Sequence, residues 1–226
     1  MKSPIKLLTK STRMVIFDGN ISTLMIKELM VKCALENIPT WFEPTSCDKA
    51  IRVVQSSTLP LLTYMSPSLD ELYAISNEIA PHSDDPHEFN LQCIEHHVRK
   101  GKNSIHPGRP IDVWFLVLEA MIQESCEGST TKHIIVTLGH RGVAHGSTSK
   151  EKISFSHYLG SPMPSTTNCT GAGDTLVAGT VYGVLGGNDV AKSLQMGMAA
   201  ARKSLLAPEA IHPELSSQDL NLLISI

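Results

Sequence analysis

The chain has 226 residues, of which 42% are hydrophobic and 18% are charged, so it has enough apolar residues to bury a core. A net charge of -3 and a pI near 6.4 argue against nucleic acid as a partner, and no apolar run reaches the length of a membrane span. The five cysteines are odd in number, widely spaced and without a Cys-x-x-Cys pair, which argues against a zinc ribbon or a disulfide framework and predicts a reducing, cytoplasmic location.

Residues 1–13 form a short basic segment without acidic residues. This composition is compatible with a mitochondrial transit peptide, although the segment is short and contains Pro4. The interpretation we favour is a short helix whose cations face water. The globular part of the chain is expected to begin at residue 14.

A strand, a helix and a second strand are predicted next. Residues 14–17 and 38–43 are apolar and β-favouring, and residues 21–35 between them repeat at helical spacing. The apolar residues of this helix include Leu24, Leu29, Met30, Val31 and Leu35. This order of elements predicts a parallel βαβ unit with a right-handed crossover.

Polar residues follow both strands. Asp18 and Asn20 come after the first strand, and Glu43 and Lys49 come at and after the end of the second. Because the carboxyl ends of parallel strands commonly face the ligand crevice, these residues are candidates for binding. For Glu43 and Lys49 the alternative is a solvated loop pair, which would contribute little to stability.

Two helices are predicted further along. Residues 48–54 are expected to form a short helix, and an apolar run covers 59–65. Ser68 then precedes Glu71 by three residues, which is the spacing of a capping box, so a helix is expected to begin there.

The stretch 81–110 gives few signals beyond a helical pattern over 88–100, and its histidines fit no zinc-binding spacing. A helix is predicted over 111–125, a buried strand over 131–138 and another strand over 150–158.

Thr137, Gly139 and Gly142 lie at the end of the predicted strand 131–138. Glycines at such a position permit either a tight hairpin or a close approach of the backbone to a ligand. Both alternatives remain open on the local sequence alone.

The run 168–175, Asn-Cys-Thr-Gly-Ala-Gly-Asp-Thr, leads into small and apolar residues. It predicts a glycine-bearing turn that opens a buried helix, and the unpaired N–H groups at such a helix start bind anions such as phosphate. Asp174 in this turn is either a general base or a helix cap. No Gly-Lys-Ser/Thr follows, which excludes a Walker A loop, and Leu176 replaces the third glycine of a dinucleotide fingerprint. Farther on, Asn188 is expected to cap a helix over 190–206.

These motifs resemble those of the PfkB, or ribokinase-like, carbohydrate kinases. The run 170–175 with the small-residue helix behind it is similar to the second signature of that family. The resemblance implies that Asp174 is the catalytic base. It also implies that the backbone amides of Gly171, Ala172 and Gly173 form an anion hole for the transferring phosphoryl group, and that ATP and Mg²⁺ are the cofactors.

The resemblance extends to the cofactor-binding residues. Thr137, Gly139 and Gly142 match the family's strand and turn near the nucleotide, and Thr170 and Asn168 lie beside the catalytic turn. Asn168 stands where many members carry an aspartate at a cation loop, so dependence on a monovalent cation such as K⁺ is left open.

Ser68 and Glu71 resemble the family's Asn-x-x-Glu element, which organises magnesium and phosphates through water. Glu71 matches the glutamate. Ser68 departs from the family's asparagine and has a shorter reach, which puts metal handling in question.

Three stretches resemble the pseudouridine kinase branch of the family: residues 43–49, the strand end with Asp18 and Asn20, and residues 210–215. The resemblance implies that Asp18 and Asn20 contact a small-molecule nucleoside or sugar. A homodimer is left open, and no nucleic acid or membrane partner is expected.

The likeness runs from Val15 to Leu215 and implies an α/β, ribokinase-like fold, with a mainly parallel sheet flanked by helices on both faces in one kinase domain over 14–226. The family's first strands, its sugar-holding residues and its β lid have no counterpart in the sequence. The domain is therefore expected to be incomplete at its N-terminus, either as a fragment or as a natural short relative.

The predicted function is ATP-dependent phosphorylation of a sugar or nucleoside hydroxyl, with pseudouridine as the favoured acceptor and pseudouridine 5′-phosphate as the product. Ribose, fructose and adenosine are alternative acceptors. The rival from another class is a catalytically weak or inactive nucleotide-binding protein of the same fold. The absent lid and Ser68 favour the rival, whereas the presence of Asp174 favours the enzyme.

Overall fold

The computed structural model describes residues 8–79, 117–118, 120–121, 131–149, 152–160, 168–213 and 215–216. The chain divides into two compact units: Met1–Leu138 with Ala144–His157, and Gly139–Val143 with Tyr158–Ile226. The predicted helix at 88–100 lies outside the described residues, as does most of the predicted helix at 111–125. Among the helices in the described ranges, none is long and apolar enough to cross a bilayer.

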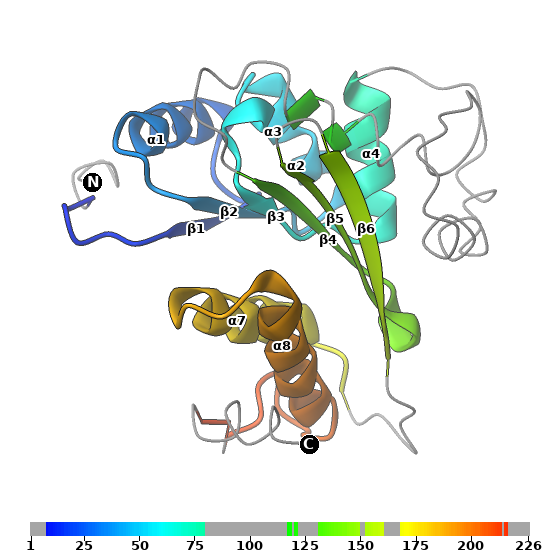
Figure 1. Ribbon diagram of the computed structural model, residues 1–226. Coiled ribbons are helices and arrows are strands. Elements are labelled where there is room, and N and C mark those ends of the chain that lie inside the picture. Colours follow the sequence, from blue (N-terminus) through cyan, green and yellow to red (C-terminus); the bar gives the residue numbers. More distant parts are fainter. Residues whose placement is uncertain are drawn as a thin grey trace. The chain divides into compact units, whose positions relative to one another are not determined.

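A six-stranded sheet, with the strands in the order β1 to β6, forms the centre of the first unit (Figure 1). The first four strands are paired in parallel, as the βαβ pattern predicts. They are β1 (Val15–Asp18), β2 (Thr40–Glu43), β3 (Tyr64–Met65) and β4 (Lys132–Thr137). The neighbouring strands β5 (Gly142–Ser149) and β6 (Lys152–Leu159) follow after short connections, so they run antiparallel to their neighbours, because a parallel pair needs a long crossover.

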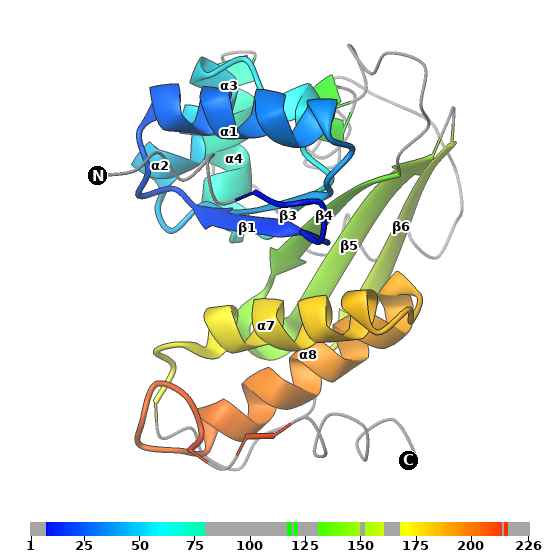
Figure 2. The ribbon, with the colours of Figure 1, turned by 90° about the vertical axis from the view of Figure 1, so that its left-hand side faces the viewer.

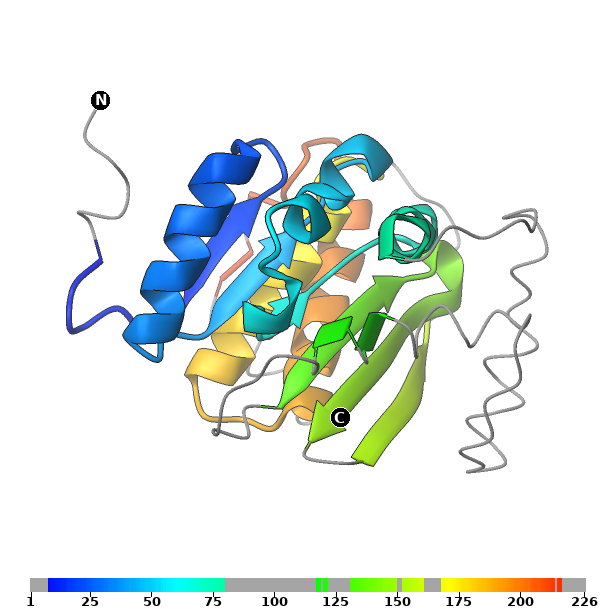
Figure 3. The same ribbon diagram turned by 90° about the horizontal axis from the view of Figure 1, so that it is seen from above.

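Helices of the first unit lie over one face of strands β1–β4 (Figure 3). They are α1 (Thr23–Leu35), α2 (Cys47–Ala50), α3 (Arg52–Gln55) and α4 (Leu69–Ile79). The helix predicted over 48–54 is therefore two short helices, α2 and α3, that meet at Ile51. Part of the apolar run at 59–65 forms a 3₁₀ turn, η2 (Leu59–Leu61), before β3 begins.

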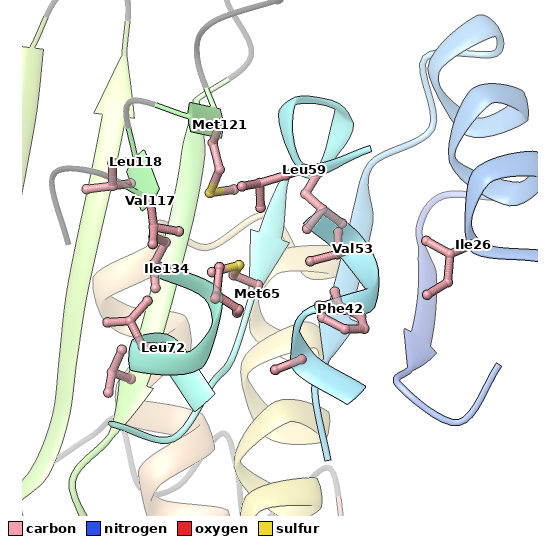
Figure 4. Packing of buried hydrophobic residues seen from close by; sticks show 14 of the residues in the cluster. Ile26, Phe42, Val53, Leu59, Met65, Leu72, Val117, Leu118, Met121 and Ile134 are labelled. Atoms are coloured by element: carbon pink, nitrogen blue, oxygen red, sulfur yellow. The ribbon is translucent and has the colours of Figure 1, made fainter. Parts of the chain in front are cut away.

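The core of the first unit lies between the sheet and these helices (Figure 4). Phe42, Met65 and Ile134 come from three neighbouring strands, and each is fully buried. Val53 and Leu72 meet them from α3 and α4. Because Trp41 alternates with Phe42 along β2, its side chain lies on the opposite face of the sheet.

Helix α1 buries a different set of side chains from the apolar positions singled out in the sequence. Leu29 and Met30 are buried, but Leu24, Val31 and Leu35 are 69%, 44% and 75% exposed. Those three residues lie on one side of the helix, since they are spaced by seven and four residues. The buried side instead includes Ile26 and Cys33.

The second unit is built on two helices that pack along each other, α7 (Ala172–Leu185) and α8 (Val190–Leu205) (Figure 2). Their backbones approach closely because glycines face the contact. A Cβ atom at Gly179 would lie 2.8 Å from the Cα atom of Gly197, and one at Gly183 would lie 2.8 Å from the Cα atom of Ser193. This explains the small residues that follow the run 168–175 in the sequence.

The prediction that Asn188 caps α8 is wrong. Asp189 is the N-cap residue, and its carboxylate accepts a 2.7 Å hydrogen bond from the backbone N–H of Lys192. The amide of Asn188 instead donates to the carbonyl of Gly183, 3.1 Å away, near the end of α7. Both residue types cap helices well, so the sequence alone does not distinguish them.

Replacing Gly197 with valine is expected to destabilise the second unit by about 1–3 kcal/mol, as overpacking of a close contact does. A Cβ atom there would overlap the hydroxyl of Thr180 and the carbonyl of Leu176. Gln195→Val introduces the same side chain at an exposed position of α8 and is the matched control. Thermal melts by circular dichroism compare the two variants, and equal melting temperatures would contradict the close packing.

Candidate active site

The turn before α7 has the form that the run 168–175 predicts. Gly171 is the N-cap residue of α7 and has φ = 77°, in the left-handed region that favours glycine. A Cβ atom there would also collide with the carbonyl oxygen of Ala210. Both the backbone angle and the contact therefore require glycine at this position.

The turn is held in place from two sides. The hydroxyl of Thr175 donates to the carbonyl of Gly171 at 2.7 Å and lies 3.2 Å from the hydroxyl of Ser204 on α8. The side-chain amide of Asn168 donates to the carbonyl of Pro208 at 3.0 Å and accepts a 2.9 Å bond from the N–H of Thr170. The predicted cofactor-binding residues Asn168 and Thr170 thus shape the turn itself.

The first turn of α7 contains Ala172, Gly173 and Asp174. Backbone N–H groups at a helix start have no acceptor within the helix, and they lie at the positive end of its dipole. The N–H of Ala172 makes a long 3.4 Å bond to the carbonyl of Cys169. A Cβ atom at Gly173 would meet no atom of the described residues within 4 Å, so this part of the structure leaves the backbone there open to a ligand.

The side chain of Asp174 is exposed. It is the third residue of α7, and the N-cap residue, Gly171, has no side chain to cap the helix. The interpretation of Asp174 as the helix cap is therefore not what the structure shows. An exposed carboxylate on the first turn of a helix is placed to accept a proton from a bound group.

In the first unit, the turn after β1 is a closed polar network. Both carboxylate oxygens of Asp18 accept hydrogen bonds from Asn20, one from its backbone N–H at 2.9 Å and one from its side-chain amide at 2.7 Å. Lys49 donates to the amide oxygen of Asn20 at 2.6 Å, and Arg52 donates to the carbonyl of Gly19 at 2.7 Å. The predicted substrate residues Asp18 and Asn20 are brought together, with Lys49 beside them.

Ser68 and Glu71 form the predicted capping box at the start of α4. The Glu71 carboxylate accepts a 2.7 Å bond from the N–H of Ser68, and the Ser68 hydroxyl accepts a 3.3 Å bond from the N–H of Glu71. Thr137, at the end of β4, is bridged to Ser68 through the backbone. The structure thus brings a predicted nucleotide residue next to the predicted metal residues.

The surroundings of Glu71 are negatively charged. The pKa of the Cys47 thiol is raised, mainly by desolvation and to a smaller extent by the negative charges of Glu71, Asp70 and Asp48. No group of three or more metal-binding side chains is present among the described residues. A single carboxylate in a negative environment suits Mg²⁺, which takes few protein ligands and keeps water and phosphate oxygens around it.

Gly139 is the first residue of a 3₁₀ turn, η4 (Gly139–Arg141), and Gly142 follows this turn as the first residue of β5. Gly142 has φ = 97°, and a Cβ atom there would collide with the carbonyl oxygen of Tyr158. A turn between neighbouring antiparallel strands therefore accounts for this glycine, as the hairpin alternative proposes.

Glu43, a binding candidate from the sequence, is linked by hydrogen bonds to two buried residues of the sheet that the sequence did not single out. The indole N–H of Trp41 donates to the hydroxyl of Ser66 at 2.6 Å, and that hydroxyl donates to the carboxylate of Glu43. The only signal in the sequence is that Trp41 and Glu43 are two residues apart on a predicted strand, which places them on one face. Ser66 joins them only through the pairing of β2 with β3.

The predicted site residues thus fall into two sets, each described within its own unit. Strand ends and the start of α4 in the first unit bring together one set, which consists of Asp18, Asn20, Ser68, Glu71 and Thr137. The turn before α7 and the turn after β4 in the second unit hold the other, which consists of Gly139, Gly142, Asn168, Thr170, Gly171, Ala172, Gly173 and Asp174.

The chain is similar to known carbohydrate kinases. Residues 117–217 match the family model described as pfkB family carbohydrate kinase. The chain is also 26% identical over 241 aligned residues to a pseudouridine kinase of Arabidopsis thaliana, an alignment that covers 90% of this chain and 59% of the relative. The predicted resemblance to the PfkB family and its pseudouridine kinase branch is confirmed.

Solved structures show the same fold. The ribokinase of Arabidopsis thaliana complexed with ribose and ATP superposes with a TM-score of 0.68 at 14% identity, covering 100% of this chain and 60% of that one. The ribokinase of Thermotoga maritima gives a TM-score of 0.63 at 17% identity, covering 100% of this chain and 62% of that one. The predicted α/β, ribokinase-like fold is confirmed, and the chain spans less than two thirds of each of these proteins.

Proposed function

We propose that the chain transfers a phosphoryl group from ATP to a hydroxyl of a sugar or nucleoside, since its residues 117–217 match the pfkB family carbohydrate kinase model. The observation that carries the proposal is the start of α7, where an open glycine turn and the exposed Asp174 occupy one helical turn. The favoured acceptor is pseudouridine, giving pseudouridine 5′-phosphate, because the chain resembles a pseudouridine kinase over 90% of its length.

In the proposed reaction, Asp174 takes the proton from the acceptor hydroxyl as that oxygen attacks the γ-phosphorus. The bond from this phosphorus to the bridging oxygen of ATP breaks, and ADP leaves. The N–H groups of Gly171, Ala172 and Gly173 stabilise the negative charge on the phosphoryl oxygens, since they are fixed at the positive end of the helix dipole.

Glu71 is the proposed residue for holding Mg²⁺, with Ser68 positioning its carboxylate. Bound with ATP, the metal neutralises phosphate charge. Thr137, Gly139, Gly142, Thr170 and Asn168 are proposed to shape the nucleotide site, and Asp18 and Asn20 to shape the acceptor site.

The first test is ADP release from Mg-ATP by the purified chain, measured with pseudouridine, uridine, ribose, adenosine and fructose and without any acceptor. The proposal expects one acceptor, pseudouridine, to stimulate ADP release well above the acceptor-free rate. Stimulation by another acceptor would keep the kinase and change its substrate. If no acceptor stimulates ADP release while Mg-ATP still raises the melting temperature, the chain is a nucleotide-binding protein and the kinase proposal is wrong.

A further inference from the structure

A chain of buried polar contacts ends at Glu43, at the carboxyl end of β2. Trp41 is 0% exposed and Ser66 is 3% exposed, whereas Glu43 is half-buried. The indole N–H of Trp41 can only donate, so the oxygen of Ser66 accepts from it. The single hydroxyl proton of Ser66 is then directed to the carboxylate of Glu43.

The indole at the start of this chain is held by stacked rings. Trp41, Tyr64 and His133 are in direct register across β2, β3 and β4. The rings of Trp41 and Tyr64 are 5.0 Å apart at 10°, and those of Tyr64 and His133 are 4.6 Å apart at 11°. His145 on β5 ends the stack, 5.2 Å from His133. A ring packed in this way cannot turn its N–H away from Ser66 without breaking the stack.

Glu43 is the last residue of β2 and is paired in register with Asp18. Its Oε2 atom accepts the hydrogen bond from Ser66, which anchors the carboxylate to a rigid buried support. The carboxylate lies at the end of the sheet where parallel strands present ligand-binding groups. Such a support fixes the direction of a binding group before the ligand arrives.

We propose that Glu43 is a specificity-determining residue that accepts a hydrogen bond from a hydroxyl or N–H group of the acceptor, and that Trp41 and Ser66 are the positioning residues that fix its carboxylate. This inference rests on the proposed function, since it assigns a role within the acceptor site. A nucleoside such as pseudouridine offers both kinds of donor, and the ribose ring offers hydroxyls.

The test measures KM for the acceptor and for ATP separately. Glu43→Gln keeps the size of the side chain but removes its charge, and it is expected to raise the acceptor KM by about 10-fold with the KM for ATP unchanged. Ser66→Ala is expected to raise the acceptor KM about 5-fold. Ser66→Thr keeps the hydroxyl, so its acceptor KM is expected to lie close to the wild-type value. Ser56→Ala is the matched control. It removes another buried serine hydroxyl of the first unit, one that bonds to the carbonyl of Val53, so it should lower stability alone.

Binding of the acceptor without ATP, followed by thermal shift, separates this inference from the proposed reaction. If the wild-type chain binds the acceptor but does not turn it over, the kinase proposal fails, and weaker binding by Glu43→Gln still supports the role of Glu43. Equal acceptor binding and equal KM values in wild type and Glu43→Gln would overturn the inference, and so would a wild-type chain that binds no acceptor of the panel. Glu43→Gln changes a half-buried side chain, so the test does not depend on the Ser66 variants being folded.

Discussion

Replacing Asp174 with asparagine is expected to lower the rate of phosphoryl transfer by about a thousandfold while leaving nucleotide binding intact. Asparagine has the same shape but cannot take the proton of the acceptor hydroxyl. The carboxylate is exposed and is not the N-cap of α7, so its loss should remove only a small, dipole-related contribution to stability, about 0.3–1 kcal/mol. The measurements are kcat from ADP release and the rise in melting temperature on adding Mg-ATP.

Asp189→Asn is the matched control for this variant. It makes the same chemical change at the N-cap of α8, in the same unit, where asparagine caps as well as aspartate does. Its kcat should equal that of the wild type. A kcat for Asp174→Asn within a few-fold of wild type would show that Asp174 is not the base, and a loss of Mg-ATP binding would assign it to the nucleotide site instead.

The local sequence predicted the parts of the fold that depend on neighbouring residues. The glycine turn at Gly171, the capping box of Ser68 with Glu71, and the parallel pairing of β1 and β2 all follow from short patterns. Their geometry is fixed by backbone angles, helix ends and side-chain period, which the residues themselves determine.

Other parts of the fold could not be predicted in this way. Strand β5 was not predicted, because its residues, Gly-Val-Ala-His-Gly-Ser-Thr-Ser, contain no β-favouring run. The strand forms through its pairing with the strands beside it in the sheet. The apolar spacing of α1 likewise did not show which of its apolar residues are buried, since Leu29 and Met30 are buried whereas Leu24, Val31 and Leu35 are exposed.

The candidate site shows the same division. Asp174 was predicted from its position in a motif. The support beneath Glu43 was not, because Ser66 lies 23 residues away and meets Glu43 only when β2 and β3 pair. The contact between His133 and His145 likewise depends on the register of β4 with β5. Contacts of this kind follow from the fold and cannot be read from the spacing of residues.

Acid is expected to destabilise the protein strongly through His133 and His145. Both side chains are 8% exposed, and their rings form a 3.0 Å contact between Nδ1 of His133 and Nε2 of His145. Burial lowers the pKa of His145 to about 4, and burial together with the charge of His145 lowers the pKa of His133 to about 3. The contact needs an N–H on one ring and an unprotonated nitrogen on the other, so it is lost when both rings are protonated, because two donors then face each other.

The sign follows from the direction of these pKa values. Unfolded histidine has a pKa near 6.5, so below that pH the unfolded chain binds protons that the folded protein does not. The contribution of the pair to stability is fully present above pH 6.5 and is lost as the pH falls toward 4. In this window each imidazole lowers the free energy of unfolding by about 1.4 kcal/mol per unit fall in pH. The two together lower it by up to about 3 kcal/mol per pH unit.

Urea unfolding between pH 7 and pH 4 measures this slope, and the comparison is with the double variant His133→Phe, His145→Phe. Replacing both partners by apolar rings leaves no buried donor or acceptor unpaired and keeps a ring beside Tyr64, so the cost at pH 7 should be small. Protonation of the carboxylates lowers the free energy of unfolding equally in both proteins. The difference between their plots of unfolding free energy against pH therefore reports the two imidazoles alone. His140→Phe, at an exposed histidine, should follow the wild type. Parallel curves for the wild type and the double variant would show that the buried pair is protonated in the folded protein without cost, and the assignment of a neutral pair would then be wrong.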